Sequence, residues 1–226
     1  MCCIISGDPI DDPSGRIKTF GGPNRFQTNM LNAPCAGGCG TCCWCMGQFI
    51  PITGGCTQYL LRRKVLNYDM TKYSCFQGKF SFCCGAVEAD ACGERNCPDF
   101  CAFLEGCCCN CLAVSASRIY VMEKYDLQSD PCDYRLIRIN NFLQMLSCLC
   151  DILALFNGNF RQIARIVDHI ADLFYHTISG CMTAQTSFEV DYQNSLLAGG
   201  NFQANGYTQS PAAVAVAVPS DYSKYQ

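Results

Sequence analysis

Cysteine is concentrated in two short stretches of this chain, and that density limits the folds it can adopt. Five cysteines fall between Cys35 and Cys45, with three glycines among them, and six more fall between Cys97 and Cys111. In all, 22 of the 226 residues are cysteine. Thiols at this density serve as disulfides, as metal ligands or as small buried apolar groups, and the redox state of the compartment selects among these roles.

The N-terminal sequence favours the reduced state. Residues 1–16 have no basic segment followed by a long apolar stretch, so they do not resemble a secretory signal peptide. The chain also contains no Asn-x-Ser/Thr acceptor for N-glycosylation. We therefore expect an intracellular protein with reduced thiols, and an oxidised disulfide scaffold is the alternative.

Reduced cysteines at these spacings predict a metal site. Two overlapping Cys-x2-Cys steps lie in the first cluster, and a third lies in the second cluster. The two sulfurs of such a step hold one Zn²⁺ at about 2.3 Å, and a second pair completes the tetrahedron. We predict zinc as the cofactor, with its ligands drawn from Cys39, Cys42, Cys45, Cys56, Cys97, Cys101, Cys108 and Cys111.

Three other assignments of the cysteines stay open. Three Cys-x9-Cys spacings occur, and twin spacings of that length mark some small oxidised proteins with paired helices. An iron–sulfur cluster would also use four thiolates. Thiols also pack as small apolar side chains, which is what we expect of Cys148, Cys150 and Cys181.

The charged and catalytic residue types give little support to an enzyme or to a nucleic-acid-binding protein. The formal net charge is −3, with acidic and basic residues interspersed, so no basic face is predicted. His169 and His176 lie seven residues apart on one face of a helix, but nothing selects a cysteine as their nucleophilic partner. We predict that the protein is not an enzyme and does not bind nucleic acid. For the acidic residues between the cysteine clusters, a solvated loop is favoured and the attraction of cations is the alternative; they are Glu88, Asp90, Glu94 and Asp99.

The apolar segments predict attachment to a membrane surface without a clean span. The segment 142–156 has 15 residues and is interrupted by Gln144 and Asp151, whereas a spanning helix needs about 20 apolar residues. Cys2 and Cys3 follow the initiator Met and are candidate S-acylation sites, and two acyl chains anchor a protein stably. We therefore predict a peripheral protein on the cytoplasmic face of a membrane.

By composition the chain divides into three parts. Residues 1–34 are rich in Gly, Pro, Asn and Asp, which predicts an extended N-terminal arm, and residues 193–226 form a low-complexity C-terminal tail. The cysteine-rich helical domain occupies residues 35–192. Inside it, helices are predicted at 58–67 and 113–124, each after a cysteine cluster and before a Tyr-Asp turn.

The C-terminal half of the domain predicts a helical hairpin. Residues 134–157 and 160–179 carry apolar residues at spacings of three and four, on either side of an Asn-Gly-Asn turn. We expect the apolar stripes to belong to the core and Gly180 to cap the second helix. The predicted fold class is mainly α with irregular cysteine-rich loops, in which a small metal- or cysteine-stabilised helical domain carries a C-terminal helical hairpin.

Three segments of the chain together resemble the placenta-specific-eight family of cysteine-rich proteins. They are CGTCCWCMGQFIPITGGC, SRIYVMEKYDLQSDPCDY and FLQMLSCLCDI, within residues 35–155. The most specific residues are Arg118, Tyr120, Tyr125, Leu127, Cys132 and Asp133. The chain departs from the family pattern because no Cys-Pro-Cys follows Cys42-Cys43 and because residues 73–99 look like an insertion. The resemblance implies a non-enzymatic, membrane-associated protein linked to divalent-metal handling and growth control.

The expected function is therefore that of a membrane-associated protein that binds a divalent metal through clustered thiolates. The alternative is a structural or accessory subunit that docks into a larger protein assembly through its extended arms, since such segments become ordered on binding.

Overall fold

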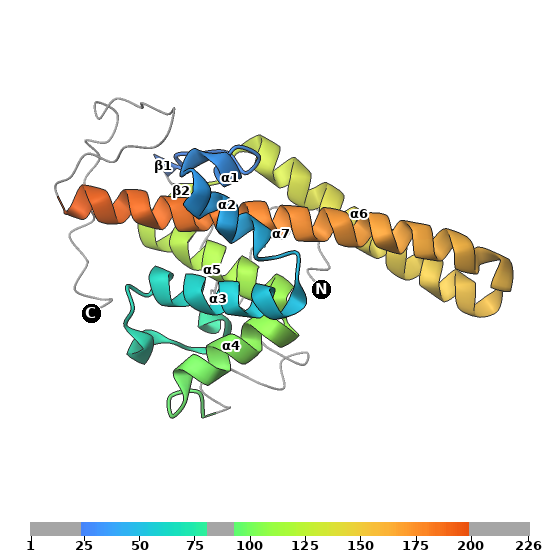
Figure 1. Ribbon diagram of the computed structural model, residues 1–226, viewed down its shortest axis with the longest axis horizontal. Coiled ribbons are helices and arrows are strands. Elements are labelled where there is room, and N and C mark those ends of the chain that lie inside the picture. The colour runs from blue at the N-terminus through green and yellow to red at the C-terminus, as the bar shows by residue number, and fades with distance from the viewer. Residues whose placement is uncertain (1–23, 81–92, 199–226) are drawn as a thin grey trace.

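A computed structural model describes residues 24–80 and 93–198, and the predicted mainly α fold class is confirmed (Figure 1). In chain order the elements are β1 Asn24–Arg25, α1 Ala33–Ala36, α2 Cys39–Met46, α3 Pro51–Val65, α4 Pro98–Cys108, α5 Asn110–Tyr125, β2 Leu127–Gln128, α6 Pro131–Phe156 and α7 Arg161–Leu197. Short 3-10 turns lie at Met70–Lys72, Cys75–Gly78 and Gly158–Phe160.

Local sequence signals explain several of these boundaries. Helices α3, α4 and α6 each have a proline in the first turn, where the missing N–H costs no hydrogen bond. Helix α5 ends at Asp126, which adopts the left-handed conformation with φ 54°. The chain then turns into β2, which pairs in parallel with β1, with Asn24 opposite Leu127.

The cysteine clusters are helical over most of their length, so the prediction of irregular cysteine-rich loops is confirmed only in part. The first cluster forms α1 and α2, and the second forms α4 and the start of α5. The break between α1 and α2 falls at Gly38, whose φ of 69° favours glycine. Cysteine has an ordinary helix propensity, so closely spaced cysteines do not interrupt a helix unless a residue such as Gly38 lies between them.

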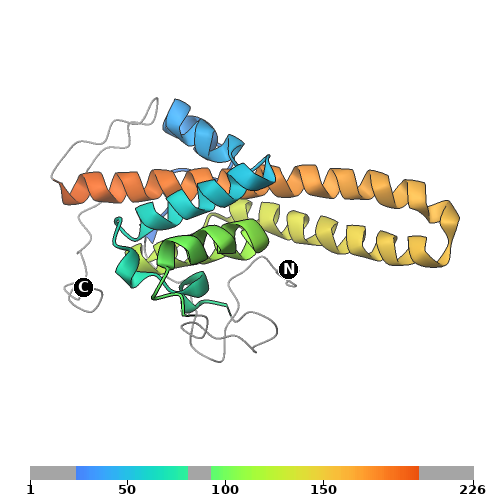
Figure 2. The same ribbon diagram turned by 60° about the horizontal axis from the view of Figure 1, so that its bottom comes forward.

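Helix α7 runs through the whole described part of the molecule (Figures 1 and 2). Every residue from Ile178 to Val190 is buried, and helices α1, α2, α3, α5 and α6 all contact α7. One hydrophobic cluster forms around Met30 and Ala184, and a second forms around Leu61 and Val190. Trp44 of α2 packs against both clusters, so the core surrounds the second half of α7.

The predicted helical hairpin is confirmed as α6 and α7, but its second helix does not end at Gly180. Helix α7 continues through Gly180 to Leu197, so Gly180 does not cap the helix. Gly180 lies instead where α2 contacts α7. A Cβ atom at Gly180 would lie 2.7 Å from the backbone oxygen of Cys45, so only glycine lets α2 pack this closely on α7. The structure describes the predicted N-terminal arm from residue 24, with Phe26 and Met30 buried, and the predicted tail as far as residue 198.

The assignment of the apolar stripes to the core is wrong over much of the hairpin. Large apolar side chains of both helices point away from the protein, and 48% of Phe142 and 63% of Leu173 are exposed. The periodicity was sufficient to predict the helices, because it records that each helix has an apolar face. It carries no information on whether that face meets protein or some other apolar medium.

Candidate functional site: an exposed apolar hairpin

The two long helices extend beyond the rest of the protein as an antiparallel pair (Figures 1 and 2). We call residues 139–173 the hairpin: it comprises α6 from Ile139, the turn Gly158–Phe160, and α7 as far as Leu173. All other described residues are called the base. The base contains the hydrophobic clusters, whereas the hairpin projects away from them.

The surface of the hairpin is rich in large apolar side chains. Leu155 and Phe156, next to the turn, are 83% and 86% exposed. The other exposed apolar residues are Ile139, Phe142, Met145, Leu149, Ile152, Leu153, Phe160, Ile163, Ile166, Ile170 and Leu173. Soluble monomeric proteins rarely expose continuous apolar areas of this kind, and such areas mark contact with a partner or a membrane.

Small and polar side chains take part in the contact between the two helices, and Leu143, Leu146 and Val167 are half-buried in the hairpin. Ala164 and Ala171 are seven residues apart on one face of α7, and both are buried. The Gln144 side chain donates a hydrogen bond of 2.9 Å to the backbone oxygen of Ala171, and Ser147 donates to the carboxylate of Asp168. Small residues and interhelical hydrogen bonds at the contact, with large apolar residues outside, are typical of helices that pack within lipid.

One edge of the hairpin is polar. Arg161, Arg165, His169 and Asp172 are all exposed and follow one another at spacings of four, four and three residues, so they form a single stripe along α7. We call this stripe the polar edge. The exposed Ile163, Ile166, Ile170 and Leu173 lie at spacings of three, four and three on another face of the same helix.

Helix α6 is apolar and long enough to cross a membrane. The most apolar stretch of α6 is not buried within the described protein. Among the described residues, α4 and α5 are long and apolar enough only when taken together, and they are bent by 118° at the break between them.

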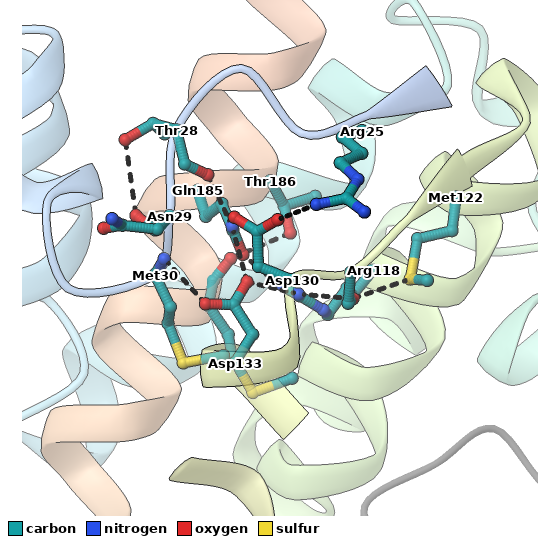
Figure 3. A network of polar contacts seen from close by, with 12 residues as sticks. Arg25, Thr28, Asn29, Met30, Arg118, Met122, Asp130, Asp133, Gln185 and Thr186 are labelled. Carbon is teal, nitrogen blue, oxygen red and sulfur yellow. Dashed lines mark hydrogen bonds and ion pairs between the residues drawn. The ribbon is translucent and has the colours of Figure 1, made fainter. Parts of the chain in front are cut away.

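A buried polar network within the base holds the first turn of α6, the helix that continues into the hairpin (Figure 3). Asp133, in the first turn of α6, accepts hydrogen bonds from the Met30 backbone at 3.0 Å and from Gln185 of α7 at 2.9 Å. Its carboxylate also lies 3.2 Å from the guanidinium of Arg118 on α5. Arg118 in turn contacts Ser129 and Gln185, so three helices and the N-terminal segment meet at one carboxylate.

The ion pair in this network is almost completely enclosed. Arg118 is 3% exposed, Asp133 1% and Gln185 0%. Burial lowers the pKa of Arg118, and the neighbouring Asp133 carboxylate opposes that shift. Removing one partner of such a pair leaves a buried charge without compensation. Arg118 and Asp133 both belong to the sequence pattern that resembles the placenta-specific-eight family, and in this chain they form a buried ion pair.

The predicted zinc ligands are distributed over several surfaces. Cys39, Cys42, Cys56, Cys97 and Cys108 are exposed, Cys101 and Cys111 are half-buried, and Cys45 is buried. Cys39, Cys42, Cys45, Cys56, Cys97 and Cys108 are free thiols. The candidate acylation sites Cys2 and Cys3 lie outside the described residues.

Some of these thiols lie close together, although not as a four-ligand set. The sulfurs of Cys39 and Cys43 are 4.0 Å apart on the outer face of α2. On the inner face, a hydrogen bond with Cys181 lowers the pKa of Cys45 to about 7 and raises the pKa of Cys181. In residues 24–80 and 93–198, no three His, Cys, Asp or Glu side chains form a group that could hold a metal ion. Zinc binding therefore stays a prediction.

The other residues with candidate chemistry have structural contacts. His176 stacks edge-on against Tyr175 at 5.2 Å and lies 6.2 Å from the ring of Phe49. Glu94 is buried and accepts a hydrogen bond from the backbone of Cys75, so the prediction of a solvated acidic loop is wrong at this position. Asp99 accepts a hydrogen bond from the hydroxyl of Tyr59. Glu88 and Asp90 lie outside the described residues.

The sequence of α6 contains a signal for this arrangement that apolar periodicity alone does not reveal. Asn140, Gln144, Ser147 and Asp151 follow one another at spacings of four, three and four residues within an otherwise apolar helix. Gln144 and Ser147 make the contacts with α7. A polar seam with this spacing indicates that the polar side of the helix faces its neighbour, which leaves the apolar side outside.

The chain matches no protein-family model, no curated protein and no solved structure. The resemblance to the placenta-specific-eight family therefore stays a prediction, and the function must be inferred from the chemistry of the hairpin itself.

Proposed function

We propose that this protein associates with membranes by inserting the apolar surface of its hairpin into a lipid bilayer. The observation that carries the proposal is the difference in packing between the base and the hairpin. In the base, three clusters of apolar side chains are enclosed together with hydrogen-bonded polar residues. In the hairpin, Ala164 and Ala171 are buried and Gln144 and Ser147 bond across the helices, whereas most of the large apolar side chains lie outside. Lipid is the solvent that stabilises the second arrangement.

The size of the exposed surface supports the same proposal. Leu155 and Phe156 alone present two nearly complete apolar side chains at the end of the hairpin. Burying a side chain of this size is worth about 1.5–3 kcal/mol. Two such residues therefore supply a binding free energy of several kcal/mol before the rest of the hairpin contributes.

Flotation with lipid vesicles tests the proposal. The purified chain, kept reduced, is mixed with vesicles of phosphatidylcholine and phosphatidylserine and centrifuged through a density gradient. We expect the wild-type protein to float with the vesicles. The double variant L155S/F156S should partition about a hundredfold more weakly, because two apolar side chains no longer enter the lipid.

A matched control separates lipid insertion from general stickiness. Phe100 on α4 is 60% exposed, like the hairpin residues, but belongs to the base. Phe100→Ser should float as well as the wild type. The proposal is overturned if the wild type stays in the lipid-free fraction, or if L155S/F156S floats equally well. Wild-type self-association in water that the tip variant abolishes, without vesicle binding, would identify the hairpin as a protein interface instead.

The remaining sequence predictions are compatible with this proposal but do not carry it. Acylation of Cys2 and Cys3 would add to the membrane affinity, because two weak anchors together hold a protein stably. The alternative function, an accessory subunit that docks through its arms, depends mainly on residues 1–23 and 199–226, which lie outside the described part of the chain.

A further inference from the structure

The apolar length of the hairpin leaves two ways of entering a bilayer. From Ile139 to Phe156, α6 rises about 27 Å, which is close to the thickness of the hydrocarbon core. On length alone the hairpin could therefore stand across the membrane or lie along its surface. The distribution of charge on α7 distinguishes the two.

The polar edge is incompatible with a hairpin that stands across lipid by itself. Arg165 and His169 lie one and two turns from the start of α7, so in an upright hairpin both would sit within the hydrocarbon. Asp172 would follow them on the same exposed stripe. Charged side chains at that depth are costly unless they face a partner or a water-filled cavity.

A hairpin that lies along the surface places the same residues favourably. All the charges of the polar edge are on one side of α7, so one rotation about the helix axis directs them all toward the headgroups and water. Asp168 stays within the hairpin, where it accepts a hydrogen bond from Ser147. Exposed apolar residues such as Ile163 and Ile170 are then directed into the acyl chains.

We infer that the hairpin lies parallel to the membrane plane within one leaflet, with Arg161, Arg165, His169 and Asp172 toward the headgroups. This inference rests on the proposed function and specifies its geometry. The partner is the boundary between the headgroups and the acyl chains of a bilayer, in which helices with one apolar and one charged face are buried by about 5–10 Å.

Two neighbouring residues of α7 provide a sharp test. His169 and Ile170 are both exposed and differ by one position, but His169 belongs to the polar edge and Ile170 to the apolar face. Consecutive residues are separated by about 100° around the helix axis, so in a helix parallel to the membrane their side chains can differ in depth by several ångströms, whereas in an upright helix they differ by about 1.5 Å. Depth at these two positions therefore reports the orientation of the helix.

Tryptophan fluorescence can measure this depth because the chain has a single tryptophan, Trp44. The variants W44F/H169W and W44F/I170W are each bound to vesicles that contain phosphatidylcholine brominated near the headgroup or deep in the acyl chain. W44F/F156W, with the probe at the end of the hairpin, reports insertion itself. If W44F proves unstable, the same probes are introduced with Trp44 retained, and the signal of the wild type is subtracted.

We expect Ile170→Trp to be quenched most by the deep bromines, and His169→Trp to be quenched by shallow bromines and by aqueous iodide. Equal depth at the two positions, with quenching at Phe156→Trp, would overturn the parallel orientation while the proposed membrane function stands. No quenching at any of the three probes would remove both.

Discussion

The two halves of α7 follow opposite rules. From Ile178 to Val190 every residue is buried, and these residues include Ser179, Thr183, Gln185 and Glu189. From Arg161 to Leu173 the large apolar residues are exposed, and Ile163 is 52% exposed and Ile166 56%. The buried half encloses polar residues together with apolar ones, whereas the outer half exposes both its charged residues and its large apolar residues. One continuous helix thus shows that burial is decided by the neighbours of a residue.

The largest effect is expected from breaking the polar network of the buried half. Asp133→Ala should destabilise the protein by about 3–5 kcal/mol, because Arg118 would stay buried without its counter-charge. The midpoint of urea unfolding measures the change. Asp130→Ala is the matched control. The Asp130 carboxylate lies 3.5 Å from the guanidinium of Arg25, whose side chain is 64% exposed. Surface ion pairs of this kind contribute about 0–1 kcal/mol. Equal losses in both variants would contradict the importance of the buried pair.

The close contact between α2 and the buried half is the next target. Gly180→Val should cost about 1–3 kcal/mol, because its side chain would be forced against the backbone of Cys45. Thermal unfolding of Gly158→Ala provides the comparison, as a Cβ atom at Gly158 would meet nothing within 4 Å. If the two substitutions shift the melting temperature equally, the tight packing at Gly180 is not a determinant of the fold.

A pH dependence of stability is expected from the buried half. Burial raises the pKa of Glu189 from an ordinary 4.5 to about 7, and its carboxylate accepts hydrogen bonds from the Gln27 backbone and the Gln193 side chain. Between these two pH values the folded chain holds a proton that the unfolded chain has released. Stability should therefore fall as pH rises from about 4.5 to 7, by up to about 1.4 kcal/mol per pH unit, and then level off.

Glu189→Gln tests that assignment, because the amide has the same shape and does not titrate. Urea unfolding at a series of pH values should show a shallower fall in stability for the variant across this window. An unchanged slope would assign the pH dependence to other groups.

The smallest change in the free energy of unfolding is expected from substitutions in the exposed hairpin. Leu149→Ser and Ile170→Ser should each alter the free energy of unfolding in water by about 0.5 kcal/mol, because their side chains are 49% and 53% exposed and little packing is lost. Vesicle binding should nevertheless weaken. A loss of stability in water comparable to that of Gly180→Val would show that these residues belong to a protein core after all.

Periodicity and turn signals predicted the helices well. The hairpin, its turn and the helix before β2 follow from apolar spacing and from Asn-Gly-Asn, which are local properties of the chain. The extent of α7 was not predictable in this way. Residues 179–190 carry no apolar stripe, and Gly180 imitates a helix cap, so the buried half of the helix was missed. Its residues are helical because five other helices surround them, which is information that no local window contains.

The candidate site illustrates the same limit. Apolar stripes on α6 and α7 were visible, but a stripe that faces lipid and one that faces a core have the same spacing. Only the polar seam that includes Gln144 and Ser147 distinguishes them, and reading it requires knowledge of which helix lies opposite. The cysteine spacing was equally ambiguous, because a helical Cys39 and Cys45 point to different sides of α2.

The continuity of α7 has a mechanical consequence. Its 37 residues form a rod about 55 Å long, and α2 rests against it at Gly180, near the middle. Residues 178–190 of this rod are enclosed by five other helices. A force that tilts the hairpin would therefore act on a clamped segment, and it could be relieved only by bending α7 or by repacking the base.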